Sequence, residues 1–148
     1  MTRQLAVVAV VVAASVVVGV TAVAYALEVQ ITTVRAVDHG PSDAQLDALR
    51  PRLRRLVGYR SFQVVREERR QCAWQATEAF KIPGGRLLHV VPKRMHEQTV
   101  AMQVRLTDRR RPLVDTDFRL QNRGVLLFAV DRDVRGVVPL IIVLRAEQ

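Results

Sequence analysis

The 148-residue chain contains a single cysteine, Cys72, so no disulfide can form within it. In an oxidising compartment a lone thiol is buried, bridges to another chain or has no role, and no histidine stands beside Cys72 to activate it. The three histidines His39, His89 and His96 have neither the helical spacing nor the neighbouring cysteine that a zinc site needs. We therefore expect Cys72 to be buried, and we assign no metal ion and no cofactor.

Catalytic motifs are also missing. There is no Gly-x-Ser-x-Gly elbow, no phosphate-binding glycine loop and no cysteine–histidine pair. Asp115 and Asp117 face the same way in a strand pattern, whereas catalytic carboxylates usually come from different elements across a cleft. Residues 131–136 begin like a calcium loop, but Arg135 stands at a ligand position and Ile142 where the bidentate glutamate belongs. We predict no catalytic residue and a non-enzymatic protein; a small hydrolase or metal protein is the least supported alternative.

Lysine is scarce, and the basic excess of +9 is carried by 21 arginines against Lys81 and Lys93. So uneven a ratio is typical of a GC-rich genome and does not by itself indicate a polyanion ligand. The arginines nevertheless form three clusters, which are Arg50, Arg52, Arg54 and Arg55, then Arg66, Arg69 and Arg70, and finally Arg109, Arg110 and Arg111.

These clusters suggest a class of partner. Nucleic-acid modules interleave basic residues with exposed aromatic residues, and aromatic residues make up only 5% of this chain. Anionic lipid head groups or envelope polysaccharide fit such a surface better than nucleic acid does. We treat the ten clustered arginines as the candidate polyanion contacts, and we identify no small-molecule ligand.

The chain does have one long apolar run, at its start. Residues 5–26 carry no charge, Arg3 precedes them, and the first acidic residue is Glu28. A membrane-spanning helix needs about 20 such residues, so the run is long enough to be an anchor. The basic start and Ala24-Tyr25-Ala26 also fit a cleavable secretory signal. Residues 1–26 are therefore either a signal peptide or a signal anchor.

Both alternatives place the rest of the chain, residues 27–148, outside the cytoplasm. The positive-inside rule is strongest close to the membrane, and no basic residue follows the run until Arg35. We predict a location in the periplasm or on the inner membrane, with a single domain exposed beyond the membrane. About 122 residues are enough for one domain with its own core.

A short helical pattern opens this domain. Ser42 is a suitable N-cap and Gln45 completes a capping box. Pro51 removes a hydrogen bond inside the pattern, so the helix over residues 43–57 is kinked, or two short helices meet with Pro51 in the first turn of the second. Gly58 is a suitable stop. The apolar stripe consists of Leu46, Leu49, Leu53 and Leu56.

After Gly58 the apolar residues recur with period two, which indicates strands. Pro83-Gly84-Gly85 predicts a hairpin turn, and the apolar run 137–145 predicts a central strand covered on both faces. The expected strands are residues 29–37, 61–68, 75–82, 86–92, 100–108, 113–120, 125–130 and 137–145. The fold class is α+β: one kinked amphipathic helix packed on a mainly antiparallel β-meander sheet, after the N-terminal signal or anchor helix.

The order of these segments resembles that of short, uncharacterised exported proteins of high-GC Gram-negative bacteria of the myxobacterial type. The residues that carry the resemblance are 46–56, Tyr59-Arg60-Ser61-Phe62, residues 82–87 and residues 111–116. Those proteins tend to have a Gly-Gly-Pro turn where this chain has Asp131-Arg132-Asp133. The resemblance implies the fold and export, and it implies no activity, cofactor or site.

Together these observations predict an exported or membrane-tethered envelope domain that acts as a non-enzymatic interaction or assembly module. Its partner would be an envelope protein or an anionic membrane surface. The alternative function is binding of anionic lipid or polysaccharide through the arginine clusters.

Overall fold

The computed structural model describes residues 26–131 and 137–148. The signal or anchor predicted over residues 1–26 lies outside this part except for Ala26, and so does most of the loop 131–136. Among the described residues, no helix is both long and apolar enough to cross a membrane.

The described residues form antiparallel strands and two short helical segments, as the α+β class requires. In chain order the elements are β1 (Leu27–Val37), η1 (Ala44–Leu49, a 3-10 helix), α1 (Arg50–Val57), β2 (Ser61–Cys72), β3 (Glu78–Ile82), β4 (Arg86–His96), β5 (Thr99–Asp108), β6 (Arg111–Gln121), β7 (Val125–Val130) and β8 (Leu140–Glu147).

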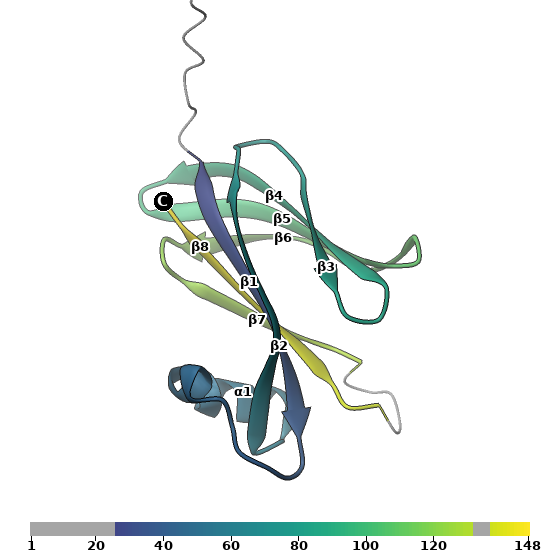
Figure 1. Ribbon diagram of the computed structural model, residues 1–148. Coiled ribbons are helices and arrows are strands. Elements are labelled where there is room, and N and C mark those ends of the chain that lie inside the picture. The colour runs from purple at the N-terminus through teal and green to yellow at the C-terminus, as the bar shows by residue number, and fades with distance from the viewer. Residues whose placement is uncertain (1–25, 132–136) are drawn as a thin grey trace, which may run out of the picture.

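The strands divide into two four-stranded sheets, whereas the sequence pattern indicated one (Figure 1). The second sheet has the order β3-β4-β5-β6 and is the expected meander. The first sheet has the order β2-β1-β8-β7, so its two central strands come from opposite ends of the described chain. Pairing between such distant strands depends on which faces must be covered, and the local alternation of residues does not reveal it.

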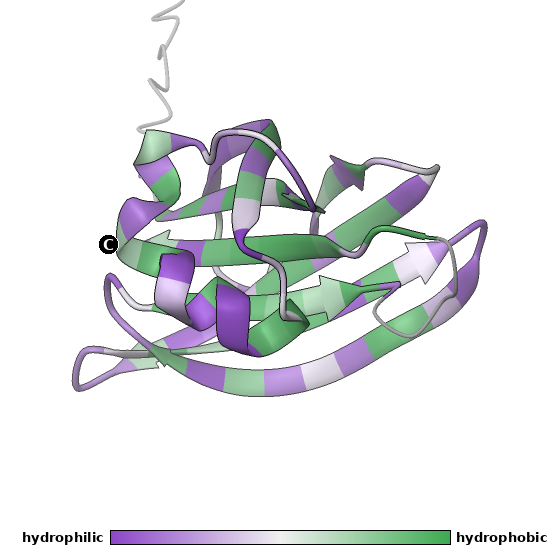
Figure 2. Cartoon of the chain, turned by 90° about the horizontal axis from the view of Figure 1, so that it is seen from below, coloured by the Kyte–Doolittle hydropathy of each residue, from purple (hydrophilic) through white to green (hydrophobic). Residues whose placement is uncertain are grey.

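The larger core fills the space between the two sheets. β1 contributes Leu27, Val29 and Ile31, and the facing sheet contributes Phe80 and Met102, all at most 3% exposed. Hydrophilic and hydrophobic residues alternate along the long strands in Figure 2, as expected where one face of each sheet meets the core.

A smaller core lies on the other face of the first sheet, under η1 and α1. It is built from Leu46, Leu49 and Leu53 of the helical stripe, which pack with Phe62 of β2 and with β8. β8 therefore has buried side chains on both faces: Ile142 and its neighbours at alternate positions enter the larger core, and the residues between them enter the smaller one. This confirms the prediction that the last strand is central and covered on both sides.

The helical segment is broken rather than bent. η1 ends at Leu49, and Pro51 lies in the first turn of α1, where its missing N–H costs no hydrogen bond. Gly58 ends α1 with φ of 78°, a left-handed conformation that glycine adopts without strain. The predicted Ser42 cap is wrong, because the Ser42 hydroxyl instead accepts a hydrogen bond from the backbone N–H of Phe62 at 3.0 Å.

That bond is one of three that cover the start of the outer edge of β2. Asp43 Oδ2 accepts the N–H of Val64 at 3.2 Å, and the Asp43 N–H donates to the Phe62 carbonyl at 2.9 Å. An uncovered strand edge offers free backbone groups to other chains. Ser42 and Asp43, at the start of the helical segment, therefore form hydrogen bonds with backbone groups at the edge of β2 and do not cap the helix.

Several strand boundaries differ from the sequence expectation: β2 continues to Cys72 beyond the expected residue 68, and β8 begins at Leu140 rather than at residue 137. Two further differences have local causes. The strand expected from residue 75 begins at Glu78, because Gln75 has φ of 67° and Ala76 donates to the Ala73 carbonyl in a turn. The strand expected to end at Pro92 continues to His96, because a bulge between Pro92 and Arg94 restores the pairing with β5.

One ion pair joins the sheets near the start of β4. Arg86 Nη2 lies 2.5 Å from Asp131 Oδ2 at the end of β7, and the Arg86 side chain is 13% exposed. Asp108 of β5 lies 3.9 Å away from Arg86 Nε and adds a second negative charge. The Arg86–Asp131 ion pair therefore connects the second sheet to β7, the edge strand of the first sheet.

Candidate binding surface

The ten clustered arginines belong to three separate parts of the fold. Arg50, Arg52, Arg54 and Arg55 lie on α1, at the bottom of Figure 1. Arg66, Arg69 and Arg70 lie on β2, and Arg109 and Arg110 form the turn before Arg111 at the start of β6. The structure therefore does not gather them into one basic patch.

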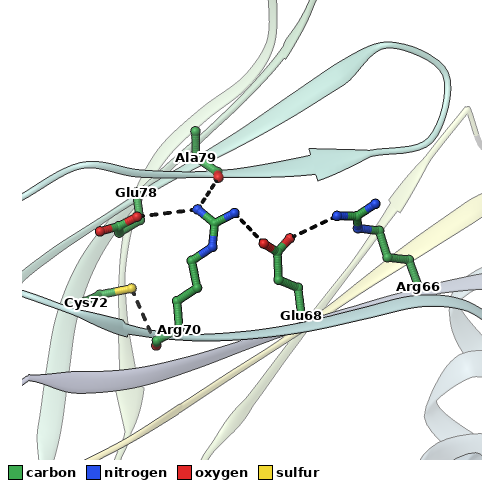
Figure 3. Close-up of polar contacts among 6 residues, drawn as sticks. All are labelled: Arg66, Glu68, Arg70, Cys72, Glu78 and Ala79. Atoms are coloured by element: carbon green, nitrogen blue, oxygen red, sulfur yellow. Dashed lines mark hydrogen bonds and ion pairs between the residues drawn. The ribbon is translucent and has the colours of Figure 1, made fainter.

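The β2 cluster is neutralised by glutamates and links the two sheets (Figure 3). Arg70 reaches from β2 to β3, where Nη1 donates to the Ala79 carbonyl at 2.6 Å and lies 3.4 Å from Glu78 Oε2. Arg70 also donates to Glu68, whose other oxygen lies 3.6 Å from Arg66 Nη2. The hydrogen bond to Glu68 raises the pKa of the Arg70 guanidinium above its ordinary value, so Arg70 stays charged.

Arg69 is paired as well, at 3.8 Å from Glu67 and 3.9 Å from Glu28 of β1. With its neighbours it forms an alternating network of positive and negative charges along the sheet edge. Such a network presents little net positive charge to a polyanion. Its position indicates a structural role in holding β2, β1 and β3 together.

The α1 cluster is only partly neutralised. Arg50 pairs with Asp47 at 2.5 Å, and Arg52 donates to the Val125 carbonyl of β7 at 3.3 Å. Arg54 and Arg55 are exposed in the last turn of the helix, where positive charge is favoured by the helix dipole. Neither forms an ion pair within 4.0 Å among the described residues.

The third cluster stands at the tip of the hairpin between β5 and β6. Arg109 and Arg110 have φ of 47° and 71°, the left-handed conformations of a tight hairpin turn. Arg109, Arg110 and Arg111 are all exposed, and no carboxylate of the described residues pairs with them within 4.0 Å. Of the three clusters, this one remains most available to an anionic partner.

Cys72 is buried, as predicted, at the end of β2. Its Sγ lies 3.8 Å from the Arg70 carbonyl, and burial raises the pKa of the thiol to about 11. The negative charge of Glu78 acts in the same direction, and Arg70 opposes it. Because the thiolate is the reactive form, Cys72 is a core residue and no nucleophile at neutral pH.

Asp115 and Asp117, the two carboxylates considered for a hydrolase, both lie on β6, and their surroundings are those of ordinary surface residues. Asp115 Oδ2 pairs with Arg105 Nε of β5 at 3.5 Å, and Asp115 Oδ1 accepts a hydrogen bond from Gln103 at 3.2 Å. Asp117 is exposed two residues further on. Within residues 26–131 and 137–148, no three histidine, cysteine or acidic side chains are arranged to hold a metal ion.

Within the described residues, the outer face of the second sheet, opposite the larger core, has no helix on it. Helical segments cover only the outer face of the first sheet (Figure 1). On the second sheet, side chains between the core positions of β4, β5 and β6 point outward, and they include Leu87 and Leu113, which are 38% and 39% exposed. We call this surface the open sheet face.

One end of the open sheet face is hollowed between two arginines. In the strand register Arg94 of β4 lies opposite Ala101 of β5, which lies opposite Arg119 of β6. The hollow has a volume of about 490 Å³ and is also lined by His96 and Thr99. Strand spacing places the two arginine backbones about 10 Å apart, with only the alanine methyl between them.

Sequence reasoning did not single out Arg94 or Arg119. Arg119 has the outward phase of its strand, which is the one signal that could have found it. Arg94 has the same parity as the buried Leu88 and Val90, and it faces outward only because a bulge next to Lys93 shifts the phase. The bulge near Leu113 lies between the β5–β6 turn and Arg119, so a register counted back from that turn would misplace Arg119 by one residue.

No protein-family model, curated protein or solved structure matches this chain. A function for the chain therefore has to follow from the chemistry of its own surfaces.

Proposed function

We propose that the chain is a non-enzymatic binding domain of the cell envelope, exported or tethered by residues 1–26, and that the open sheet face is its contact surface for a partner protein. The observation that supports this proposal most directly is the asymmetry of the sandwich. One sheet has one end of its outer face covered by η1 and α1, and the other presents exposed leucines on a face without a helix.

The composition of the open sheet face fits a protein interface. Leu87 and Leu113 lie at the end of the sheet near the β3–β4 and β5–β6 turns, and the Arg105–Asp115 pair lies between them and the hollow. Exposed apolar side chains rimmed by polar groups are typical of sites that other proteins cover. The charge of Arg105 is already balanced, which lowers the cost of covering it.

The proposed location depends on the apolar run at residues 5–26. In either form of that segment the domain acts outside the cytoplasm, as a periplasmic protein or on the inner membrane. Mass spectrometry of the mature amino terminus separates the two: a start at Leu27 indicates cleavage, and a start near Met1 indicates an anchor.

Site-specific photo-crosslinking in cells tests the contact surface. A photoreactive amino acid at Leu87 or Leu113 is expected to give adducts of higher mass. The same residue at Ala48, which is exposed on η1, serves as the control and is expected to give none. Equal yields at the three positions, or no adduct at either leucine, would contradict the proposal.

A second candidate function is binding of an anionic polysaccharide or lipid through the arginine clusters. The exposed Arg109, Arg110 and Arg111 favour it, because they have no acidic partner among the described residues. Replacing all three by glutamine is expected to weaken binding to lipopolysaccharide at low salt, and added salt should weaken the wild-type binding as well. Binding that is unchanged by salt and by the triple substitution would remove this candidate.

A further inference from the structure

The two sheets have a common end at which the chain enters the domain. Leu27, the first residue of β1, pairs with Cys72, and Glu28 pairs with Glu147. The turn between β4 and β5 lies at this end too, because the Asn122 N–H donates to the Gln98 carbonyl at 2.7 Å and the Gln148 N–H donates to Asn122 Oδ1 at 3.0 Å. We call it the amino-terminal end of the sandwich.

The hollow between Arg94 and Arg119 opens beside this end. The next row of the sheet, His96 opposite Thr99 and Thr99 opposite Gln121, is the last before the β4–β5 turn. The apolar run of residues 5–26 is joined directly to Leu27 in the sequence. If the run is retained as an anchor, the amino-terminal end of the sandwich is the end of the domain that is joined to the membrane.

We propose that the hollow binds the phosphate of a membrane lipid head group and so sets the amino-terminal end of the domain against the bilayer. This inference rests on the anchored form of the proposed envelope domain and adds a ligand to it. The two guanidinium groups are planar donors that match the oxygens of a phosphate. The small Ala101 side chain leaves the space in which the phosphate lies.

Charge supports this assignment. Most other arginines at this end and along the sheet edge have carboxylate partners: Arg69 and Arg70 pair with glutamates, Arg105 pairs with Asp115, and Arg123 lies 3.0 Å from Glu147. Among the described residues, neither Arg94 nor Arg119 has a carboxylate within 4.0 Å. An anion that lies between the two guanidinium groups would be attracted to both of them.

The remaining charged groups around the hollow leave it basic. His96 Nε2 lies 3.8 Å from Glu97, and both side chains are more than 80% exposed. A second hollow shares Arg94, Ala101 and Arg119 and adds Lys93 and Asp117 to the lining. Lys93 and the two arginines therefore outnumber the two carboxylates at the rim.

The same placement distinguishes this site from the arginine clusters. Arg109, Arg110 and Arg111 lie at the opposite end of β5 and β6 from Thr99 and Gln121. α1 lies at the bottom of Figure 1, and the start of β1 lies at the top. Arg94 and Arg119 therefore lie at the end of the sandwich where the apolar run joins the domain, unlike the clustered arginines of α1 and of the β5–β6 turn. Arg145 of β8, which is exposed opposite Gln30, lies near this end on the other sheet.

The full-length chain, reconstituted into vesicles, tests the proposal. An environment-sensitive fluorophore attached through Gln121→Cys reports whether this end enters the head-group region, and buried Cys72 does not compete for the label. In vesicles of phosphatidylcholine with phosphatidylglycerol, the emission is expected to be higher than in phosphatidylcholine alone. Each arginine near an anionic leaflet favours the docked state by roughly fivefold, so Arg94→Gln with Arg119→Gln should lower the docked-to-undocked ratio by roughly thirtyfold.

Two further variants separate a site from general attraction. Ala101→Leu fills the hollow without changing the charge and is expected to reduce docking, whereas Arg105→Gln, on the same face but paired with Asp115, is expected to leave it unchanged. Inorganic phosphate should displace the domain more strongly than chloride at equal ionic strength. Docking that survives the double arginine substitution, or falls equally in Arg105→Gln, would overturn the proposal.

The outcome of the vesicle experiment is independent of the photo-crosslinking result. Loss of the fluorescence response with crosslinks retained at Leu87 and Leu113 would reject the phosphate site alone. A fluorescence response without crosslinks would reject the protein contact surface and leave the phosphate site in place.

Discussion

Replacing Phe80 by alanine is expected to lower the free energy of unfolding by about 3–5 kcal/mol, the range for truncating a buried phenylalanine. Phe80 is fully buried in the core between the sheets, and Arg70 Cζ lies 4.8 Å from the centre of its ring. The substitution removes core contacts and also the ring on which the Arg70 guanidinium rests. Both effects loosen the attachment of β3 to β2.

The measurement is guanidinium unfolding of the purified chain, followed by the fluorescence of Trp74. This is the only tryptophan, and it packs against the same core. Leu113→Ala is the control, because Leu113 is 39% exposed on the open sheet face, and a surface change of this kind should cost less than about 1 kcal/mol. Similar losses in the two variants would mean that the sheets do not pack through Phe80.

Alkylation of Cys72 is expected to be at least about a hundredfold slower in the folded chain than in the unfolded chain at pH 8. Burial raises the pKa of the thiol from 9.0 to about 11, which lowers the thiolate fraction at pH 8 by roughly a hundredfold. Exclusion of the reagent from the core slows the reaction further. Reaction with iodoacetamide, followed by mass spectrometry in buffer and in denaturant, measures the ratio.

The raised pKa of the Cys72 thiol also predicts how the free energy of unfolding changes with pH. The folded state holds the thiol proton more tightly than the unfolded state does, so this contribution is fully present below about pH 9 and is lost as the pH rises toward 11. Cys72→Ala should remove this part of the alkaline loss of stability. Ala48→Cys, exposed on η1, provides a thiol that should react at nearly the unfolded rate. A fast reaction at Cys72 would mean that the end of β2 opens readily.

Local features of the structure were readable from the residues themselves. The period-two alternation located β7 at its observed bounds, Val125–Val130, and Pro51 predicted that the helical segment is kinked or divided. The continuous apolar run at the end of the chain predicted the doubly covered β8. These signals depend only on neighbouring residues, because side-chain periodicity and proline geometry act locally.

The candidate site depended on contacts that no local pattern contains. The glutamates that neutralise Arg66, Arg69 and Arg70 lie on β1, β2 and β3, and the alternation within β2 did not show which of them pair across strands. Arg94 and Arg119 are brought to one hollow by two hairpins, each with a bulge that changes the register. The sequence alone does not distinguish a solvent-exposed charged residue whose charge is neutralised by a neighbour from one whose charge is not.

The scarcity of cysteine, histidine and catalytic motifs, the apolar start and the alternating strands were determined by the sequence alone, because each is a property of composition or of neighbouring residues. The tertiary structure decided the division into two sheets, the sheet face without a helix and the pairing of each arginine. It also placed Arg94 and Arg119, unlike the clustered arginines of α1 and of the β5–β6 turn, at the same end of the sandwich as Leu27, where the apolar segment joins the domain. These outcomes depend on pairing between distant strands, since burial of apolar faces fixes which strands meet and the meeting strands fix which charges are neighbours.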